Sequence, residues 1–146
     1  MYCSSKPRSL ILIAILVIFI LQTNLLKAHA HAIFEINNVS SSDGYVVLHL
    51  YENKTSFKKF NPDRIYKKVA TKGKTIIPIN DYHEGDIAIF VFHDENSDEE
   101  FNTSIFWTPK EGYAYSNSYI PTSIPKYEEA LFRLEHGVAV NLELNY

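Results

Sequence analysis

A chain of 146 residues with a formal net charge of −3 is long enough for one packed domain and too short for two. The acidic balance argues against nucleic acid and anionic membrane surfaces as partners, because both require clustered Lys and Arg. The single cysteine, Cys3, excludes a disulfide framework and leaves the packed core as the main source of stability.

The amino-terminal segment has the pattern of a secretory signal peptide. Lys6 and Arg8 precede the uncharged apolar run Leu10–Leu21, and no acidic residue comes before it. A membrane-spanning helix needs about 20 apolar residues, so this run is shorter than an anchor and typical of a signal peptide. The alternative is an uncleaved amino-terminal anchor, because Leu25 and Leu26 extend the hydrophobicity.

Cleavage is expected after Ala30, where Ala28-His29-Ala30 gives the small-residue pattern, and cleavage after Ala32 is the competing choice. Residues 1–30 are therefore predicted to be a signal peptide, and residues 31–146 one exported domain, periplasmic or extracellular, with no stable membrane anchor. Three basic side chains leave with the signal, so the exported domain carries 14 − 3 = 11 basic and 17 acidic side chains, a net charge of 11 − 17 = −6.

Short runs of alternating apolar and polar residues predict strands along most of this domain. Ala130–Leu134 and Val138–Leu144 are expected to pair with each other across Glu135-His136-Gly137, and Pro78 is expected at an edge strand or a strand end. The other expected strands with alternating or mixed patterns are Ala32–Val39, Tyr45–Tyr51, Ile65–Ala70 and Thr75–Ile79.

Two further segments complete the expected fold. Ile87–Phe92 is unbroken apolar sequence, as in a central strand that is buried on both faces. Between Glu52 and Pro62 we expect a crossover loop with at most one helical turn, on which Phe57 and Phe60 share a side and cover one end of the domain. The sequence therefore predicts an all-β fold, a single antiparallel β-sandwich of about seven strands, immunoglobulin-like or prealbumin-like.

An acidic loop follows the central strand and is the main candidate site. Asp94, Asn96 and Asp98 match the first, third and fifth positions of an EF-hand calcium loop, but Glu99 stands where that loop needs glycine and Ile105 where it needs glutamate. A less regular calcium site is the hypothesis, with the ligands Asp94, Asn96, Asp98, Glu100 and Asn102. The competing interpretation is a solvated loop in which Asp94 and Asn96 accept hydrogen bonds from their own backbone.

Histidines and aromatic residues give further candidates. His93 can ligate a metal or carry a proton, although a hydrogen bond to a neighbouring loop is its commoner role. His49 is expected to be an ordinary exposed strand residue. An aromatic-rich stretch contains Trp107, Tyr113, Tyr115 and Tyr119. Such rings can bind a sugar or a flat ligand, or they can cover one end of the sandwich, which is the commoner role.

A copper site is the alternative from a different functional class. After cleavage at Ala30, His31 would offer both its α-amine and its imidazole, a donor pair that favours copper. A second imidazole would have to come from His49, His83, His93 or His136. The competing interpretation is that Ala-His-Ala-His-Ala is only a cleavage region.

Three motifs carry a resemblance to a known family: F-V-F-H-D-E-N at Phe90–Asn96, P-K-E-G-Y-A-Y-S-N at Pro109–Asn117 and P-K-Y-E-E-A-L-F at Pro125–Phe132. In order and spacing they resemble domain of unknown function (DUF) 2141, a family of small exported bacterial proteins. The family loop usually continues Gly-Asn-Gly-Lys-Leu-Asp after D-E-N, whereas here Ser97 and Glu99 replace the glycines and Asn102 the aspartate.

The resemblance implies an exported β-sandwich with no established activity. The residues themselves supply no assembled catalytic constellation. We therefore expect a non-catalytic binding or structural module of the cell envelope, with a small molecule, a glycan or another protein as its partner and calcium as its candidate cofactor.

Overall fold

The computed structural model describes residues 30–82, 84–105 and 108–146, and it describes the side chains from Ala32 onwards. Most of the predicted signal peptide, together with His83 and Trp107, lies outside these residues. Within the described part of the chain, no helix is long and apolar enough to cross a membrane.

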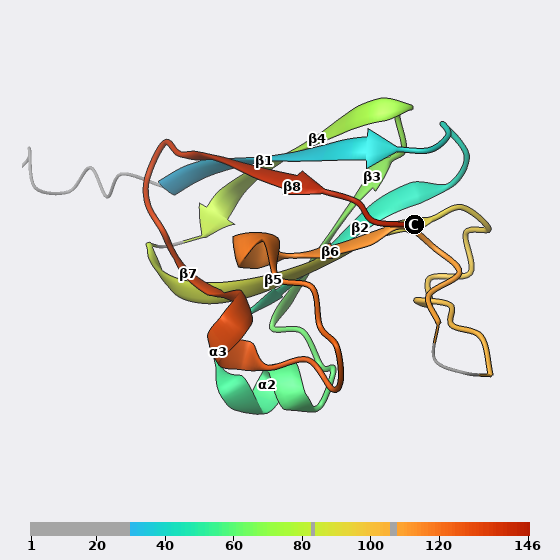
Figure 1. Ribbon diagram of the computed structural model, residues 1–146. Helices are drawn as coiled ribbons and strands as arrows, with labels where there is room; N and C mark the ends of the chain where they lie inside the picture. The colour runs from blue at the N-terminus through green and yellow to red at the C-terminus, as the bar shows by residue number, and fades with distance from the viewer. Residues whose placement is uncertain (1–29, 83, 106–107) are drawn as a thin grey trace, which may run out of the picture.

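The chain forms two β-sheets that lie in layers, with two short helices against one of them (Figure 1). The smaller sheet has three strands in the order β4-β1-β8, and the larger has five strands, with β3-β2-β5-β6 in order and β7 also paired to β5. The strands are β1 (Ala30–Val39), β2 (Tyr45–Tyr51), β3 (Arg64–Val69), β4 (Gly73–Tyr82), β5 (Gly85–Asp94), β6 (Tyr113–Tyr115), β7 (Leu131–Leu134) and β8 (Ala139–Glu143). The helices are α2 (Lys54–Lys58) and α3 (Tyr127–Ala130), and η1 (Ser116–Ser118) is a 3₁₀ turn.

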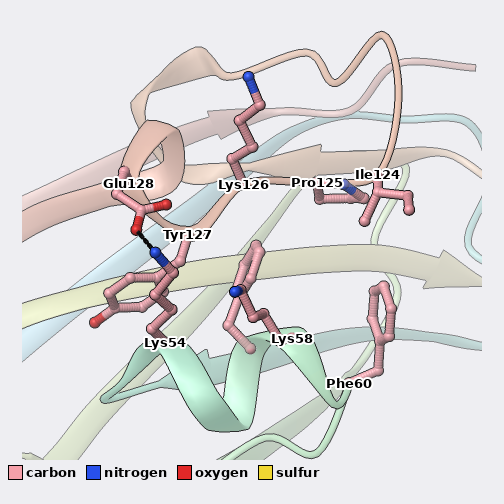
Figure 2. A pocket seen from close by; sticks show the side chains of 9 residues that line it. Lys54, Lys58, Phe60, Ile124, Pro125, Lys126, Tyr127 and Glu128 are labelled. Carbon is pink, nitrogen blue, oxygen red and sulfur yellow. Dashed lines mark ion pairs between the residues drawn. The ribbon is translucent and has the colours of Figure 1, made fainter.

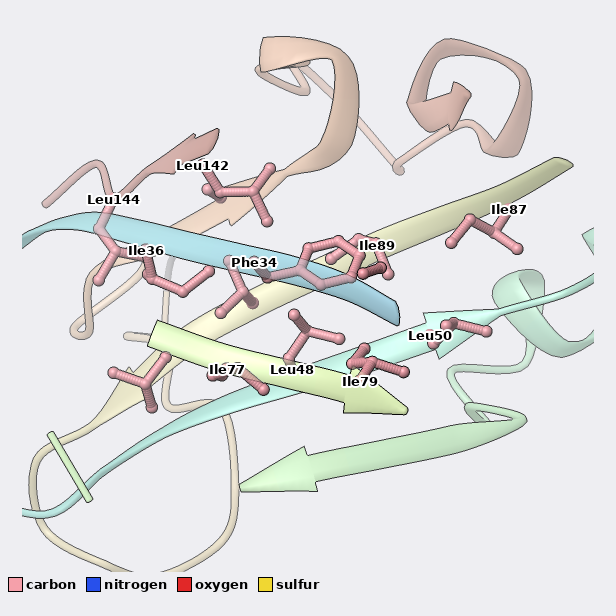
Figure 3. Packing of buried hydrophobic residues seen from close by; sticks show 14 of the residues in the cluster. Phe34, Ile36, Leu48, Leu50, Ile77, Ile79, Ile87, Ile89, Leu142 and Leu144 are labelled. Carbon is pink, nitrogen blue, oxygen red and sulfur yellow. The ribbon is translucent and has the colours of Figure 1, made fainter. Parts of the chain in front are cut away.

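The main core lies between the two sheets (Figure 3). Its side chains come from alternate positions of each strand, because every second residue of a strand points to the same face. From the smaller sheet come Phe34, Ile36, Ile77, Ile79 and Leu142, and from the larger Leu48, Leu50, Ile87, Ile89 and Val91. This packing of two sheets face to face agrees with the expected β-sandwich.

A second core covers the outer face of the larger sheet. Phe57 of α2 and Ala130 of α3 pack there against Phe90 and Tyr115, so the two helices act as a cover for this face (Figure 1). Because β5 contributes to both cores, every residue from Ile87 to Asp94 is buried. The prediction of a central strand buried on both faces is confirmed.

His49 lies on the same outer face and is half-buried instead of exposed. Its ring makes edge contacts with Phe90 and Phe92, at centroid distances of 6.0 and 5.5 Å. Burial disfavours the charged imidazolium and lowers the pKa of His49 from 6.5 to about 4.

Two expectations about strand pairing are wrong. β7 and β8 do not pair with each other, because β7 pairs with β5 in the larger sheet and β8 pairs with β1 in the smaller. The pairing of β1 with β8 is also parallel, with Phe34 opposite Val140, so the fold is not purely antiparallel. The chain crosses from one sheet to the other between Leu134 and Ala139, and a short link between consecutive strands therefore does not make a hairpin here.

The segment between β2 and β3 forms the single helical turn that the sequence predicts. The Asn53 side chain caps α2 by accepting hydrogen bonds from the backbone N–H groups of Thr55 and Ser56, each at 3.0 Å. Phe57 is buried as expected, but Phe60 is 62% exposed, so the two rings do not share a side. Phe60 comes directly after the C-cap residue of α2, and its left-handed φ of 50° ends the helix there.

Pro78 lies inside β4, opposite Ile33 of β1. β4 is an edge strand of the smaller sheet, which confirms the expected edge position of this proline.

Candidate functional site

The candidate site lies where β5 ends and the acidic loop begins. β6 returns antiparallel to β5, with Phe92 opposite Tyr113, and the backbone N–H of His93 donates to the carbonyl of Gly112 at 2.8 Å. One step further along the same pair of segments, Asp94 and Glu111 stand side by side. The fold thus brings together two carboxylates that are far apart in sequence.

Asp94 organises the first turn of the loop. Its side chain is fully buried, and its two carboxylate oxygens accept hydrogen bonds from the backbone N–H groups of Asp98 and Glu99, both at 3.1 Å. Ser97 and Glu99 both adopt left-handed backbone conformations, with φ of 61° and 66°. These are the two positions at which the family pattern described above has glycine. The loop therefore keeps a backbone conformation that favours glycine, although serine and glutamate occupy these positions.

Asp98 lies at the centre of the loop, where its carboxylate accepts hydrogen bonds from several donors. The Nδ2 amides of Asn96 and Asn102 donate to Oδ2 at 2.7 and 2.9 Å, and the backbone N–H of Glu100 donates to Oδ1 at 3.0 Å. Donors stabilise the ionised carboxylate, so the pKa of Asp98 is lowered, with the Glu100 N–H as the largest cause. Asp98 is thus held as an anion at the solvent side of the site.

Glu111 supplies the third carboxylate and is 7% exposed. Its Oε2 accepts a hydrogen bond from the backbone N–H of Asn102 at 3.0 Å, which ties the loop to the segment before β6. Burial raises the pKa of Glu111, and the negative charges of Asp94, Asp98 and Glu95 raise it further. This carboxylate is therefore ionised at a cost that a nearby cation would offset.

Oxygen atoms of Asp94, Asp98 and Glu111 all lie within 4.8 Å of one another. Calcium binds oxygen at about 2.3–2.6 Å, so two of its ligands are at most about 5 Å apart. Three carboxylate oxygens with this spacing can therefore share one calcium ion. Two of the three residues are buried, which weakens the screening of their charges by solvent.

The structure divides the predicted ligand set. Asp94 and Asp98 belong to the carboxylate cluster, and Asn96 and Asn102 reach it through Asp98. For Glu100 the contacts at the site are made by its backbone, through its N–H and its carbonyl. Asp94 also accepts hydrogen bonds from the backbone of its own loop, as the competing interpretation of a solvated loop expected. Its side chain is buried, however, and not solvated.

Glu111 is the residue that the sequence did not single out. Its position follows from the register between β5 and β6. Because Phe92 lies opposite Tyr113, Glu111 lies opposite Asp94. A closing carboxylate is thus present, but it comes from beyond the loop and not from its twelfth position at Ile105.

A lysine borders the site on the side of β3. Lys67 pairs with Glu99, with 2.8 Å between Nζ and Oε1, and its ammonium lies 4.0 Å from the centroid of the Tyr45 ring. The pair lowers the pKa of Glu99, which keeps this exposed acid charged without adding it to the carboxylate cluster.

His93 has the structural role that was considered commoner for it. The imidazole is fully buried, with Nε2 at 2.9 Å from the carbonyl oxygen of Asp43 and Nδ1 at 3.0 Å from the Tyr146 hydroxyl. Nδ1 also lies 3.2 Å from Glu95 Oε1. These contacts join the β1–β2 loop to the carboxyl-terminal segment beside the acidic loop.

The histidines proposed for copper are spread over the fold. His49 lies on the outer face of the larger sheet, and His93 contacts Ser40, which follows the carboxyl end of β1. His31 stands near the amino end of β1, and nine residues of strand span about 30 Å. His136 alone among the described candidates lies at the same end as His31, because it precedes β8, the parallel neighbour of β1. The side chain of His31 and all of His83 lie outside the described residues.

The tyrosines of the aromatic stretch belong to the second core. Tyr113, Tyr115 and Tyr119 pack against it, and the Tyr115 and Phe90 rings are 4.8 Å apart. They cover the outer face of the larger sheet instead of an end of the sandwich.

Comparison with known proteins is consistent with the three motifs of the sequence. A search of curated proteins and a search of solved structures return no match. The model of one protein family, described as uncharacterized proteins conserved in bacteria (DUF2141), matches residues 34–141, which include the acidic loop and Glu111. The chain therefore belongs to the DUF2141 family.

Proposed function

We propose that this protein is an exported, non-catalytic binding module of the bacterial cell envelope that takes up calcium at the acidic loop. The observation that carries the proposal is the cluster of Asp94, Asp98 and Glu111 oxygens within 4.8 Å of one another. Carboxylates are hard donors, and calcium accepts the irregular geometry that such a loop provides.

Two amides would add to the coordination. Asn96 and Asn102 turn their Nδ2 groups towards Asp98. Rotation of an Asn side chain about its last bond exchanges nitrogen for oxygen, so each amide can offer its oxygen to an ion instead. The ligand set is then Asp94, Asp98 and Glu111 with help from Asn96 and Asn102, and Glu100 is replaced by Glu111 relative to the sequence-based hypothesis.

Calcium would act as a structural link. It would join the end of β5, the loop and the segment before β6, and it would offset both the burial and the neighbouring negative charges that raise the pKa of Glu111. The carboxylates of Asp94, Asp98 and Glu111 already accept hydrogen bonds from backbone N–H groups, and calcium would compete with these donors for the same oxygens. We therefore expect a dissociation constant of about 10⁻⁴ to 10⁻³ M, the range of extracellular calcium modules.

Thermal unfolding of chelator-treated protein tests the proposal. At about 10 mM calcium, this affinity range predicts a stabilisation of about 1.4 to 2.7 kcal/mol by mass action. With about 4 °C per kcal/mol for a domain of this size, Tm should rise by about 6 to 11 °C. Magnesium should give a smaller shift, because it requires shorter bonds and stricter geometry.

Two matched variants show which residues are responsible. Glu111→Gln should abolish most of the calcium-dependent shift, whereas Glu100→Gln, which changes a neighbouring exposed acid, should leave it intact. If wild type shows no shift at this calcium concentration, or if Glu111→Gln shifts as much as wild type, the site is not a calcium site.

The copper alternative rests on cleavage after Ala30 and on His136, the one described histidine at the same end of the fold as His31. Its first ligand, the side chain of His31, lies outside the described residues, whereas the carboxylate cluster lies within them. The intact mass of the exported protein tests it: a chain that begins at Ile33, or one that is not cleaved, removes the amino-terminal histidine.

A further inference from the structure

A pocket of about 460 Å³ lies between helix α2 and the segment that leads into α3 (Figure 2). The buried ring of Phe57 lines it, and Phe60 and Ile124 lie across from each other at its mouth. These two residues are 62% and 82% exposed, so a ligand at the mouth would bury apolar surface of both. The volume falls in the range of about 300–1,000 Å³ that is usual for small-molecule sites.

The charge around this pocket is opposite in sign to that of the whole chain. Lys54, Lys58 and Lys126 line it together with a single acid, Glu128, so the lining carries 3 − 1 = +2, whereas the chain carries −3. Lys54 forms an ion pair with Glu128. Among the described residues, neither Lys58 nor Lys126 has an acidic partner within ion-pair distance.

Figure 2 shows how the lysines lie. The ammonium of Lys58 lies between α2 and the opposing segment, next to the apolar walls, whereas that of Lys126 points away from α2 along the outer side. Lysine has a flexible four-carbon side chain, so Lys126 can turn towards an anion bound at the mouth. The pKa of Glu128 is lowered, first by its hydrogen bond with Lys54 and also by the charges of Lys54 and Lys58, which agrees with a positive potential at this place.

The backbone at Phe60 fixes the position of its ring. A φ of 50° is uncommon for a bulky residue and costs about 1–2 kcal/mol. This conformation brings the ring out of the core and places it across from Ile124 (Figure 2). The left-handed φ belongs to the end of α2, where the N–H groups of Phe60 and Asn61 donate to the carbonyls of Phe57 and Ser56, so the helix end itself holds the ring in this exposed position.

We propose that this pocket binds a small organic anion, with an aromatic or aliphatic body between Phe60 and Ile124 and a carboxylate or sulfonate that pairs with Lys58 and Lys126. A purely inorganic anion would make no favourable contact with the apolar walls, so the best ligand should also carry an apolar group. The lysines favour an anion over a neutral molecule of the same shape. The site is separate from the acidic loop, and the proposal does not depend on calcium.

Two fluorescent probes with the same ring system test it. 1-Anilinonaphthalene-8-sulfonate carries the sulfonate, and N-phenyl-1-naphthylamine lacks it. The sulfonate probe should bind the full-length protein saturably, and the double variant Lys58→Gln, Lys126→Gln should bind it about three to tenfold more weakly. The uncharged probe should bind the double variant as it binds wild type.

Control variants separate the pocket from general surface binding. Lys72→Gln removes an exposed charge on the turn between β3 and β4 and should change neither affinity. Phe60→Gly removes the ring and also relieves the left-handed conformation, so the fold should be kept while both probes bind more weakly. An aliphatic carboxylate such as octanoate should displace the sulfonate probe at lower concentration than octanol, which has the same chain length and no charge.

The proposal is overturned if the sulfonate probe shows no saturable binding. It is also overturned if its affinity in the double lysine variant is within 1.5-fold of wild type, if Lys72→Gln weakens it equally, or if Phe60→Gly leaves both affinities unchanged.

Discussion

Ser116 occupies the point where the central strand changes its neighbour. Along one edge, β5 pairs with β7 from Gly85 to Ala88 and with β6 from Phe90 to Phe92, so Ile89 has no strand residue opposite it. The buried Ser116 hydroxyl fills this position: it accepts from the Ile89 N–H at 2.8 Å and donates to the Ala130 carbonyl. Ser116 thus connects the two separate strands to the middle of β5.

Replacing Ser116 with alanine should leave two buried backbone groups without a partner. Each unsatisfied group costs about 1–3 kcal/mol, so we expect Ser116→Ala to lower the free energy of unfolding by about 2–6 kcal/mol. That is a large part of the roughly 5–15 kcal/mol that stabilises a typical domain, and it corresponds to a fall in Tm of about 8–24 °C.

Urea denaturation followed by circular dichroism measures this change. Ser118→Ala is the matched control, because Ser118 is exposed in the same 3₁₀ turn, and it should stay within about 0.5 kcal/mol of wild type. If Ser116→Ala is also within this margin, the hydroxyl does not satisfy the gap in β5, and the junction of β5, β6 and β7 is held together by other contacts.

Two other predictions concern the loop and the outer face of the larger sheet. Ser97→Gly should raise stability by about 1 kcal/mol, because glycine adopts a φ of 61° without strain, whereas Ser97→Ala should not; equal melting temperatures for the two variants would contradict this. For His49, the folded pKa of about 4 lies below the unfolded value of 6.5, so the unfolded state binds more protons between them. The contribution of His49 is therefore fully present above pH 6.5 and is lost as the pH falls towards 4, about 1–3 kcal/mol in total. Urea titrations at several pH values should show a shallower slope in this window for His49→Gln, and an unchanged slope would count against burial as the cause.

The sequence predicted those elements whose signal is local. β5 was recognisable because burial on both faces requires an unbroken apolar run, and β1 because burial on one face requires alternation. The helical turn α2 was also within reach. These features depend on neighbouring residues only.

Strand partners were not predictable in the same way. β7 and β8 follow each other closely and look like a hairpin, but their partners, β5 and β1, are chosen by packing between distant segments. The same limit explains the candidate site: Asp94 and Asp98 share one loop and were found, whereas Glu111 enters only through the register between β5 and β6. The outward turn of Phe60 likewise depends on a backbone conformation that its residue type disfavours.

The position of β1 has a consequence for folding kinetics. β1 is the middle strand of the smaller sheet, and its neighbours are β4 and the last strand of the fold, β8. Contacts between segments this far apart in sequence form slowly, because closing the long loop costs entropy before the contacts can stabilise the chain. The antiparallel pairs among β2, β3 and β5 can form earlier, whereas β1 keeps one unpaired edge until residues 139–143 arrive. During that interval the open edge of β1, next to Phe34 and Ile36, is the place where two incompletely folded chains would pair and aggregate.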